Sequence, residues 1–424
     1  INGENAMGAL LGEGWWSGLL SFGNIWNHFG DRQSLLAKLV ITYTDGTETL
    51  ITTNNKDWKY FDKGPVIYSS LDMGEVYDAT REAATEGWTT SAYNDNAWKS
   101  AIAVPLEGTS FTGRSTERDG TVSEFSFEKM KLTGQIGNNA GVFQVITAKS
   151  VKEVRKGVFV YDLGQNIVGV PRITFANGNS GRVITLRFAE MLYPDLKESG
   201  SNVGMIMTEN YRAALSQDIY IMKDGPQVFQ PKFTSHGFQY VEITGIDAPL
   251  PPEAVRGVAI SSVRELTAGY STSNPKVNQL WSNLVWSNID NFLSIPTDCP
   301  QRNERMGRSG DINVFSRTAT YISNAGQFLR RHLLAMRDVQ AASGRFTDVA
   351  PVGGGFGGIL WGSAVIVISW ETYQQYGDFS LLEEHYPAMV RYMDYIATTI
   401  DPETRLSSDA TLGDWLGPQN KQLG

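Results

Sequence analysis

The segment from Pro296 to Asp311 holds a dense group of acidic and basic side chains. Its sequence is PTDCPQRNERMGRSGD, with three carboxylates, three arginines, two prolines and two glycines (Asp298, Glu304, Asp311, Arg302, Arg305, Arg308, Pro296, Pro300, Gly307, Gly310). Proline and glycine interrupt regular helices, so a loop that points its charges into a cleft is a better interpretation than a solvated helix face. Hydrolysis of a glycosidic bond needs carboxyl groups at defined separations, one protonated and one ionised. We therefore expect an acid–base site in this segment.

Glu304 is the candidate general acid of this segment. A carboxyl stays protonated near neutral pH only where burial or a second negative charge raises its pKa. Asp298 and Asp311 could supply that charge. The competing interpretation is that Glu304 pairs with the neighbouring arginines and only stabilises the loop. On spacing alone, the ion pair is the commoner arrangement.

The other polar residues of the segment also have more than one interpretation. Asp298 and Asp311 could accept hydrogen bonds from sugar hydroxyls, or they could bond their own backbone in turns. Arg302 could donate a pair of hydrogen bonds to a carboxylate or to hydroxyls. Cys299 has no histidine near it in the sequence, so we interpret it as a structural thiol rather than a nucleophile.

Two tryptophans in the last quarter of the chain are candidate platforms for a sugar ring. Trp361 lies in Leu-Trp-Gly and Trp415 in Gly-Asp-Trp, and such neighbours help to open a ring face. Packing in a core is the alternative for each. Asp414 is a candidate ligand of a sugar hydroxyl, or it only forms a turn.

The sequence predicts neither a catalytic metal nor a cofactor. The four histidines show no metal-ligand spacing, and an HExxH motif is absent (His28, His236, His332, His385). The stretch 353–358 matches the G-x-G-x-x-G pattern, but no clear strand precedes it and no βαβ unit surrounds it. We therefore interpret it as a loop beside a cleft rather than a nucleotide site.

The composition narrows the class of protein. With 424 residues, 41% hydrophobic and 19% charged, the chain should fold into several domains. The net charge of −9 and the absence of a basic run argue against nucleic acid as a partner, and no apolar stretch reaches membrane-spanning length. One cysteine excludes an intrachain disulfide framework. The chain starts with isoleucine, so we expect processing or truncation; a periplasmic or secreted location is favoured, with the cytoplasm left open.

Residues 1–135 are predicted to form a β-sandwich. Two strand candidates, 36–43 and 47–53, flank Asp45-Gly46, and this pattern predicts a hairpin. No helical periodicity is sustained in this part.

Residues 136–265 are predicted to form a second β-sandwich. The stretch 157–164 alternates and then breaks, and 239–244 alternates as a strand. We expect 171–175 to meet 182–188 across a turn rich in glycine and asparagine.

Residues 266–424 are predicted to be helical, because the hydrophobic period changes from two to 3.6 near residue 273. Asp378 is a plausible cap for the last helix, and no strand is expected here. Successive helices with short turns suggest a bundle or an α/α toroid. Five helices would leave a toroid open, so we expect either that the natural polypeptide continues beyond Gly424 or that the missing half is supplied elsewhere. The predicted helices span approximately residues 273–292, 312–323, 325–342, 361–376 and 379–399.

The segment 296–311 closely resembles the signature of bacterial α-L-rhamnosidases, glycoside hydrolase family 78. Further motifs resemble the same family in the same order along the chain, among them GEGWW at 12–16, YDLGQNIVG at 161–169, LRFAE at 186–190 and LGDWL at 412–416. The resemblance implies two β-sandwich domains followed by an incomplete (α/α)6 barrel.

This resemblance also implies an inverting hydrolase that releases terminal α-L-rhamnose from rhamnosides or rhamnose-containing polysaccharides. Glu304 matches the general acid of the family. In the family, the general base is a glutamate late in the barrel, and this chain is expected to end before it. Positions that match rhamnose-binding residues or aromatic walls of the pocket are Asp298, Arg302, Asp311, Trp361 and Trp415.

Three residues depart from the family pattern. Asn303 stands where aspartate is usual, Arg308 where tryptophan is usual, and Ser363 where aspartate is usual. Two alternatives to hydrolysis of standard rhamnosides follow: a fragment that binds rhamnose-containing glycans without cleaving them, and an enzyme for acidic rhamnose polymers, which a cation at position 308 would favour. The oligomeric state stays open, a homodimer included.

Overall fold

The computed structural model describes residues 3–105, 114–116, 122–124, 131–355 and 358–409. Contacts between residues divide the chain into two compact units. Unit 1 comprises Ile1–Phe111, Val145–Val258 and Gln301–Asn303, and unit 2 comprises Thr112–Gln144, Ala259–Pro300 and Glu304–Gly424. The division into three domains at 135 and 265 stays a prediction.

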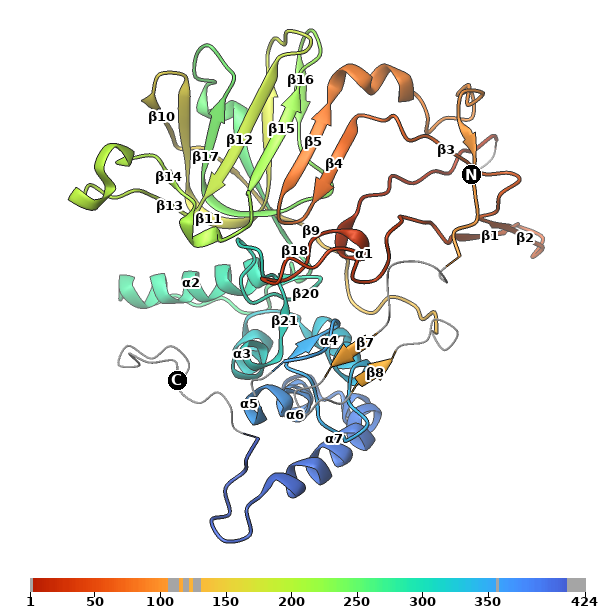
Figure 1. Cartoon of the computed structure of the whole chain (residues 1–424), viewed down its shortest axis with the longest axis vertical. Coiled ribbons are helices and arrows are strands. Elements are labelled where there is room, and N and C mark those ends of the chain that lie inside the picture. The colour runs from red at the N-terminus through yellow and green to blue at the C-terminus, as the bar shows by residue number, and fades with distance from the viewer. Residues whose placement is uncertain (1–2, 106–113, 117–121, 125–130, 356–357, 410–424) are drawn as a thin grey trace. The chain divides into compact units, whose positions relative to one another are not determined.

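A ten-stranded curled sheet dominates the β-rich part of the chain (Figure 1). Its order is β4-β5-β15-β12-β17-β11-β18-β9, and β10 and β16 also pair with β11. The parallel pair β5–β15 joins strands from the two predicted β regions in one sheet. The bounds are β4 (Val66–Ser70), β5 (Gly74–Asp78), β9 (Gly141–Thr147), β10 (Ser150–Arg155), β11 (Val158–Phe175), β12 (Val183–Ala189), β15 (Gln217–Ile221), β16 (Gln227–Phe229), β17 (His236–Thr244) and β18 (Val255–Ser261).

Smaller elements complete unit 1. The hairpin predicted around Asp45-Gly46 is confirmed, since β1 and β2 pair antiparallel with Thr42 opposite Glu48. Gly46 has φ of 83°, a conformation that glycine adopts without strain. The bounds are α1 (Gly14–Ser17), β1 (Lys38–Thr42), β2 (Glu48–Thr52), β3 (Lys59–Tyr60), β6 (Lys99–Ser100), β13 (Met191–Leu192) and β14 (Ile206–Met207).

Two strand predictions for the second β region were wrong. The expected break after Gly164 is absent, because β11 continues to Phe175 and a register shift between Asp162 and Ile167 accommodates the irregularity. The expected pairing of 171–175 with 182–188 is also absent. Strand β17 pairs with both β11 and β12, so these two strands, although close in sequence, are not neighbours in the sheet.

A fully buried polar cluster lies inside unit 1. Glu75, Asp218 and His236 each have 0% of their surface exposed. Both carboxylate oxygens of Asp218 lie 3.1 Å from His236 Nε2, and Asp218 Oδ1 accepts a hydrogen bond from the Glu75 backbone N–H at 2.9 Å. Glu75 Oε2 accepts from the backbone N–H groups of Lys232 and Phe233 at 2.9 and 3.0 Å.

The helices of unit 2 lie where the periodicity predicted them. Asn274 caps α2 and Asp378 caps α7, each by accepting a hydrogen bond from a backbone N–H two residues on. Helices α3, α4 and α7 each pack against α6, around a core that includes Leu333 and Ile368. The bounds are α2 (Pro275–Asn291), α3 (Ser309–Ile322), α4 (Gly326–Asp338), α5 (Ile359–Gly362), α6 (Ala364–Tyr376) and α7 (Phe379–Thr399).

The prediction that this region has no strands was wrong in detail. Four two-residue strands join the helices, and pairs this short give no alternating pattern in the sequence. They are β19 (Phe292–Leu293), β20 (Ile295–Pro296), β21 (Gly307–Arg308) and β22 (Val349–Ala350); the three-residue strands β7 (Arg114–Thr116) and β8 (Val122–Glu124) also belong to unit 2. Among the residues described, no helix has the length and apolar character needed to cross a membrane.

Candidate active site

The candidate catalytic side chains lie on a loop between β20 and β21. A β-bridge between Thr297 and Gly307 closes the loop, and the Asp298 N–H donates to the Met306 carbonyl at 3.0 Å. Gly307 is required in this position, since a Cβ there would lie 2.3 Å from the backbone oxygen of Ala350 in β22. The closed loop holds its two arms, and therefore Asp298 and Glu304, close to each other.

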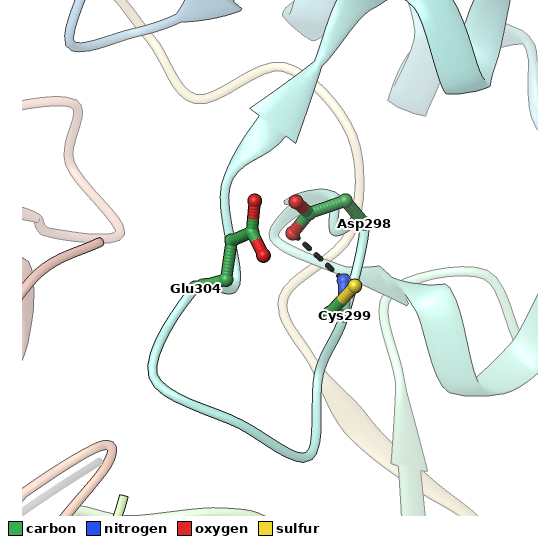
Figure 2. A group of neighbouring side chains, drawn as sticks. All are labelled: Asp298, Cys299 and Glu304. Atoms are coloured by element: carbon green, nitrogen blue, oxygen red, sulfur yellow. Dashed lines mark hydrogen bonds between the residues drawn. The ribbon is translucent and has the colours of Figure 1, made fainter. Parts of the chain in front are cut away.

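Asp298 and Glu304 point their carboxyl groups toward each other, with Cys299 beside them (Figure 2). Each of the three residues has an oxygen or sulfur atom within 4.8 Å of the others. Only 6% of the Asp298 side chain and 9% of the Glu304 side chain are exposed. Arg308 contacts both carboxyls: its Nη2 donates to Glu304 Oε1 at 3.0 Å and its Nε to Asp298 Oδ2 at 3.4 Å.

The surroundings of Asp298 favour its protonated form. Burial, then the charge of Glu304 and a hydrogen bond with that residue, raise the pKa of Asp298 to about 7. The backbone N–H groups of Cys299 and Met306 oppose this rise by donating to Asp298 Oδ1 at 2.7 and 2.9 Å. Two carboxyls this close compete for a proton, and the pKa belongs to the pair rather than to one residue. The loop thus holds an acid that keeps its proton near neutral pH.

The distance between the two carboxyls limits their chemical roles. The acid and base of an inverting glycosidase stand roughly 6.5–9.5 Å apart, with a water between them. Asp298 and Glu304 are hydrogen-bonded, so no water or sugar atom fits between them. Asp298 can therefore hold or release a proton for Glu304, but it is not the opposing base. The atoms within 4.8 Å are compatible with metal coordination, yet Arg308 already supplies a positive charge to both carboxylates, and we assign no metal here.

Asp311 and Trp361 also belong to unit 2, in α3 and α5. Asp311 is exposed in the first turn of α3, where a carboxylate is favoured by the helix dipole. Desolvation nevertheless raises its pKa; Arg308 lowers it and Glu304 raises it, so its charge interacts with both residues. Trp361 is only 8% exposed, and a Cβ at Gly310 would lie 2.6 Å from its ring. This burial favours packing over an open stacking face.

The middle of the signature segment, 301–303, belongs to unit 1. There desolvation raises the pKa of Glu190, while a hydrogen bond from Asn166 and then the charge of Arg302 lower it. Asn303 is 2% exposed; its Oδ1 accepts from the Ala213 N–H at 3.3 Å and its Nδ2 donates to Asn24 Oδ1 at 3.0 Å. The amide donor explains why asparagine suits a position where the family signature has aspartate.

Sequence reasoning missed a second buried ionic group in unit 2. Arg345 Nη2 lies 3.9 Å from Asp348 Oδ1, and Arg345 Nε lies 3.5 Å from Asp409 Oδ1. All three residues are buried, and the Asp348 carbonyl accepts from the Ser309 N–H at the start of α3 at 2.8 Å. Arg345 and Asp348 are three positions apart, but Asp409 lies more than sixty residues on, and this spacing gave no local signal for the group. The candidates Asp414 and Trp415 lie outside the described residues.

Comparison with known families accounts for nearly the whole chain. A bacterial alpha-L-rhamnosidase 6 hairpin glycosidase domain matches residues 265–423, a bacterial alpha-L-rhamnosidase concanavalin-like domain matches 152–261, and an alpha-L-rhamnosidase N-terminal domain matches 1–118. The chain belongs to the bacterial α-L-rhamnosidase family. The resemblance drawn from its signature segment is thereby confirmed.

Individual α-L-rhamnosidases are similar to this chain along almost its full length. The enzyme from Streptomyces avermitilis is 37% identical over 98% of this chain and 37% of its own length, and that from Alteromonas sp. is 35% identical over 99% of this chain and 42% of its own length. The chain thus spans about two-fifths of the length of these curated relatives.

Two solved structures share the arrangement of a curled β-sheet and helical segments. The crystal structure of the Streptomyces avermitilis α-L-rhamnosidase complexed with L-rhamnose has a TM-score of 0.82 at 35% identity. The match covers 95% of this chain and 36% of the Streptomyces chain. The native Aspergillus terreus enzyme has a TM-score of 0.77 at 33% identity, and the match covers 91% of this chain and 41% of the Aspergillus chain.

Proposed function

We propose that the protein to which this chain belongs is an inverting glycoside hydrolase that releases terminal α-L-rhamnose from rhamnosides or rhamnose-containing polysaccharides. The observation that carries this proposal is the buried, hydrogen-bonded pair of Asp298 and Glu304 on the loop that resembles the family signature. A rhamnosidase related to this chain has been crystallised with L-rhamnose, which supports the class of substrate.

Glu304 is the proposed general acid. It donates its proton to the glycosidic oxygen as the bond from that oxygen to the anomeric carbon breaks. Water attacks the anomeric carbon from the opposite face, and a second carboxylate takes up the proton of that water. Asp298 keeps a proton available to Glu304 until the substrate binds. Asp311, Arg302, Asp414 and Trp415 are the proposed contacts to the sugar, and Trp361 is proposed to reach it only through the small exposed part of its ring.

The proposed architecture follows the family. Residues 1–135 and 136–265 would form the two β-domains, and 266–424 the first part of an (α/α)6 barrel. The packing of α3, α4 and α7 against α6 supports a layered helical arrangement of this kind.

The test of this function is hydrolysis of an aryl α-L-rhamnoside by the natural full-length protein and its Glu304→Gln variant. A general acid contributes about 10²–10⁴-fold to the rate, so kcat should fall by that factor while calorimetry still detects binding of L-rhamnose. Glu383→Gln, which changes an exposed glutamate on α7, is the matched control and should leave kcat unaltered. Unchanged turnover in Glu304→Gln would remove Glu304 from the role. Binding of L-rhamnose without any hydrolysis by the natural protein would favour the binding-only alternative.

A further inference from the structure

Arg308 is the residue of the site that the family signature does not explain, because a tryptophan is usual in its position. Its guanidinium donates to Glu304 Oε1 at 3.0 Å and lies 3.4 Å from Asp298 Oδ2. Only 14% of its side chain is exposed. A cation engaged by two carboxyls in this way is not free to recognise a uronate, so the structure gives no support to an acidic polymer as substrate.

The charge balance of the three residues gives Arg308 a different role. Two carboxyls that share one proton carry a net charge of −1, and a guanidinium, which does not titrate at any relevant pH, brings the group to neutrality. An opposite charge within about 4–6 Å favours the ionised form of a carboxyl and lowers its pKa by roughly 1–3 units. By this rule, a guanidinium 3.0 Å from Glu304 Oε1 and 3.4 Å from Asp298 Oδ2 should oppose burial and the mutual repulsion of the two carboxyls.

Other titratable and charged groups near the pair are few among the described residues. Cys299 lies beside Asp298, Arg305 is buried on the same loop, and Asp311 stands in the first turn of α3. From α4, the ring of His332 lies 3.3 Å from where a Cβ of Gly307 would stand; burial lowers the pKa of His332 to about 3, so this ring is neutral at working pH. Arg308 is a cation that contacts both carboxyls.

We propose that Arg308 sets the pH at which the Asp298–Glu304 pair releases its shared proton, and with it the upper pH limit of hydrolysis. The inference rests on the proposed function, since it takes the protonated pair as the source of the catalytic proton. A general acid works only while it is protonated, so activity is lost as pH rises through the pKa of the pair. Arg308 keeps that limit lower than the two buried carboxyls alone would place it.

The experiment compares the pH dependence of kcat/KM for the natural full-length protein with that of its Arg308→Gln and Arg308→Lys variants. Removal of the positive charge should move the alkaline limb of the profile upward by about 1–2 pH units. Lysine keeps the positive charge but has a single ammonium group in place of the forked guanidinium. The alkaline limb of the Arg308→Lys profile should therefore move by a smaller amount. A residue that only stabilised the loop would change the height of the profile and not the position of the limb.

Arg308→Trp is the second neutral variant, and the family signature accommodates tryptophan in this position. An upward shift of the alkaline limb in either neutral variant that folds supports the proposal, and an unmoved limb overturns it. If both neutral variants fold but lack activity, the pH dependence of their unfolding temperature is the readout. The unfolding temperature should then keep falling with rising pH until a higher pH than in the natural protein, because the pKa of the folded pair is higher. An unchanged pH dependence overturns the proposal. The two hypotheses fail separately: an active Glu304→Gln contradicts the proposed function, whereas an inactive Glu304→Gln with an unmoved Arg308→Gln limb contradicts only the role of Arg308.

Discussion

Unit 1 and unit 2 each bury carboxylates beside a basic side chain, but the two clusters are built differently. In unit 1, Asp218 faces one histidine, and both it and Glu75 accept hydrogen bonds from backbone N–H groups. All three residues of that cluster are wholly inaccessible. In unit 2, Asp298 and Glu304 face each other and share one guanidinium, on a loop that keeps a small part of each side chain exposed.

The difference shows that burial and a raised pKa do not by themselves mark a functional site. Desolvation raises the pKa of Glu75, yet a residue with no exposed surface cannot exchange a proton with a substrate. The pair in unit 2 combines a raised pKa with access and with a second carboxyl that competes for the same proton. Perturbed pKa values cluster at active sites because catalytic acids and bases need pKa values that suit proton transfer. The unit 1 cluster, in contrast, is explained by its contribution to folding.

The largest effect on stability is expected from Asp218→Ala. The change leaves His236 and the Glu75 N–H without their partner, and each buried polar group left unsatisfied typically costs about 1–3 kcal/mol. Calorimetric unfolding should show this loss in the transition of unit 1. Well below that transition, kcat/KM for an aryl rhamnoside should stay close to the natural value.

Asp218→Asn is the matched control, because it keeps an oxygen for the Glu75 N–H and should cost clearly less. If Asp218→Ala instead removed activity from a protein of unchanged stability, the cluster of unit 1 would be functional and the comparison would fail.

Asp298→Asn should have the opposite effect on stability. The folded pKa of Asp298 is raised to about 7 from an unfolded value of about 3.9. Between these values the native protein holds a proton that the unfolded chain releases, so stability falls as pH rises through this window and the full loss is present above pH ~7. Asparagine does not titrate, so the variant should lack this fall.

At pH 8 the Asp298→Asn variant should be more stable than the natural protein by on the order of 2 kcal/mol. One unit of pKa shift corresponds to about 1.4 kcal/mol, and the lost contact with Arg308 offsets part of the gain. Its kcat should fall at least tenfold. Unfolding measured from pH 4 to 9 decides the matter: an identical slope in both proteins would show that Asp298 is ionised throughout. Stability gained with activity lost is the expected signature of a catalytic carboxyl.

The local parts of the fold were predictable and the sheet was not. Helix α2 and the hairpin at Gly46 depend on neighbours a few residues apart, so their periodicity and turn residues are visible in the sequence. The position of β17 between β11 and β12 depends on pairing across dozens of residues. Strand periodicity says which face of a strand is buried, but not which strand is its neighbour.

The site shows the same division. Asp298 and Glu304 are six positions apart in a loop rich in turn residues, so their proximity was foreseeable. The contact of Arg308 with Glu304 was also foreseeable, as the competing ion pair. Its second contact, with Asp298, was not, because it depends on the bridge that closes the loop. Asp348 is a near neighbour of Arg345 in sequence, but Asp409 meets Arg345 only because the chain brings two distant segments together.

The smallest effect is expected from Asn303→Asp, which tests where the boundary between the two kinds of cluster falls. Asn303 is part of the signature segment by sequence, but its contacts are with unit 1. Aspartate would lose the donor to Asn24 Oδ1, yet the Asn24 amide can turn and donate its own N–H to the new carboxylate. The loss of stability should therefore stay below about 1 kcal/mol, the net contribution of one hydrogen bond.

Repeating the change in an Asn24→Ala background removes this replacement hydrogen bond. The loss of stability should then rise to about 1–3 kcal/mol, the penalty for an unsatisfied buried group. In neither background should the alkaline limb of kcat/KM move as far as in Arg308→Gln; a shift of equal size would place Asn303 with the catalytic pair rather than with the structural contacts of unit 1.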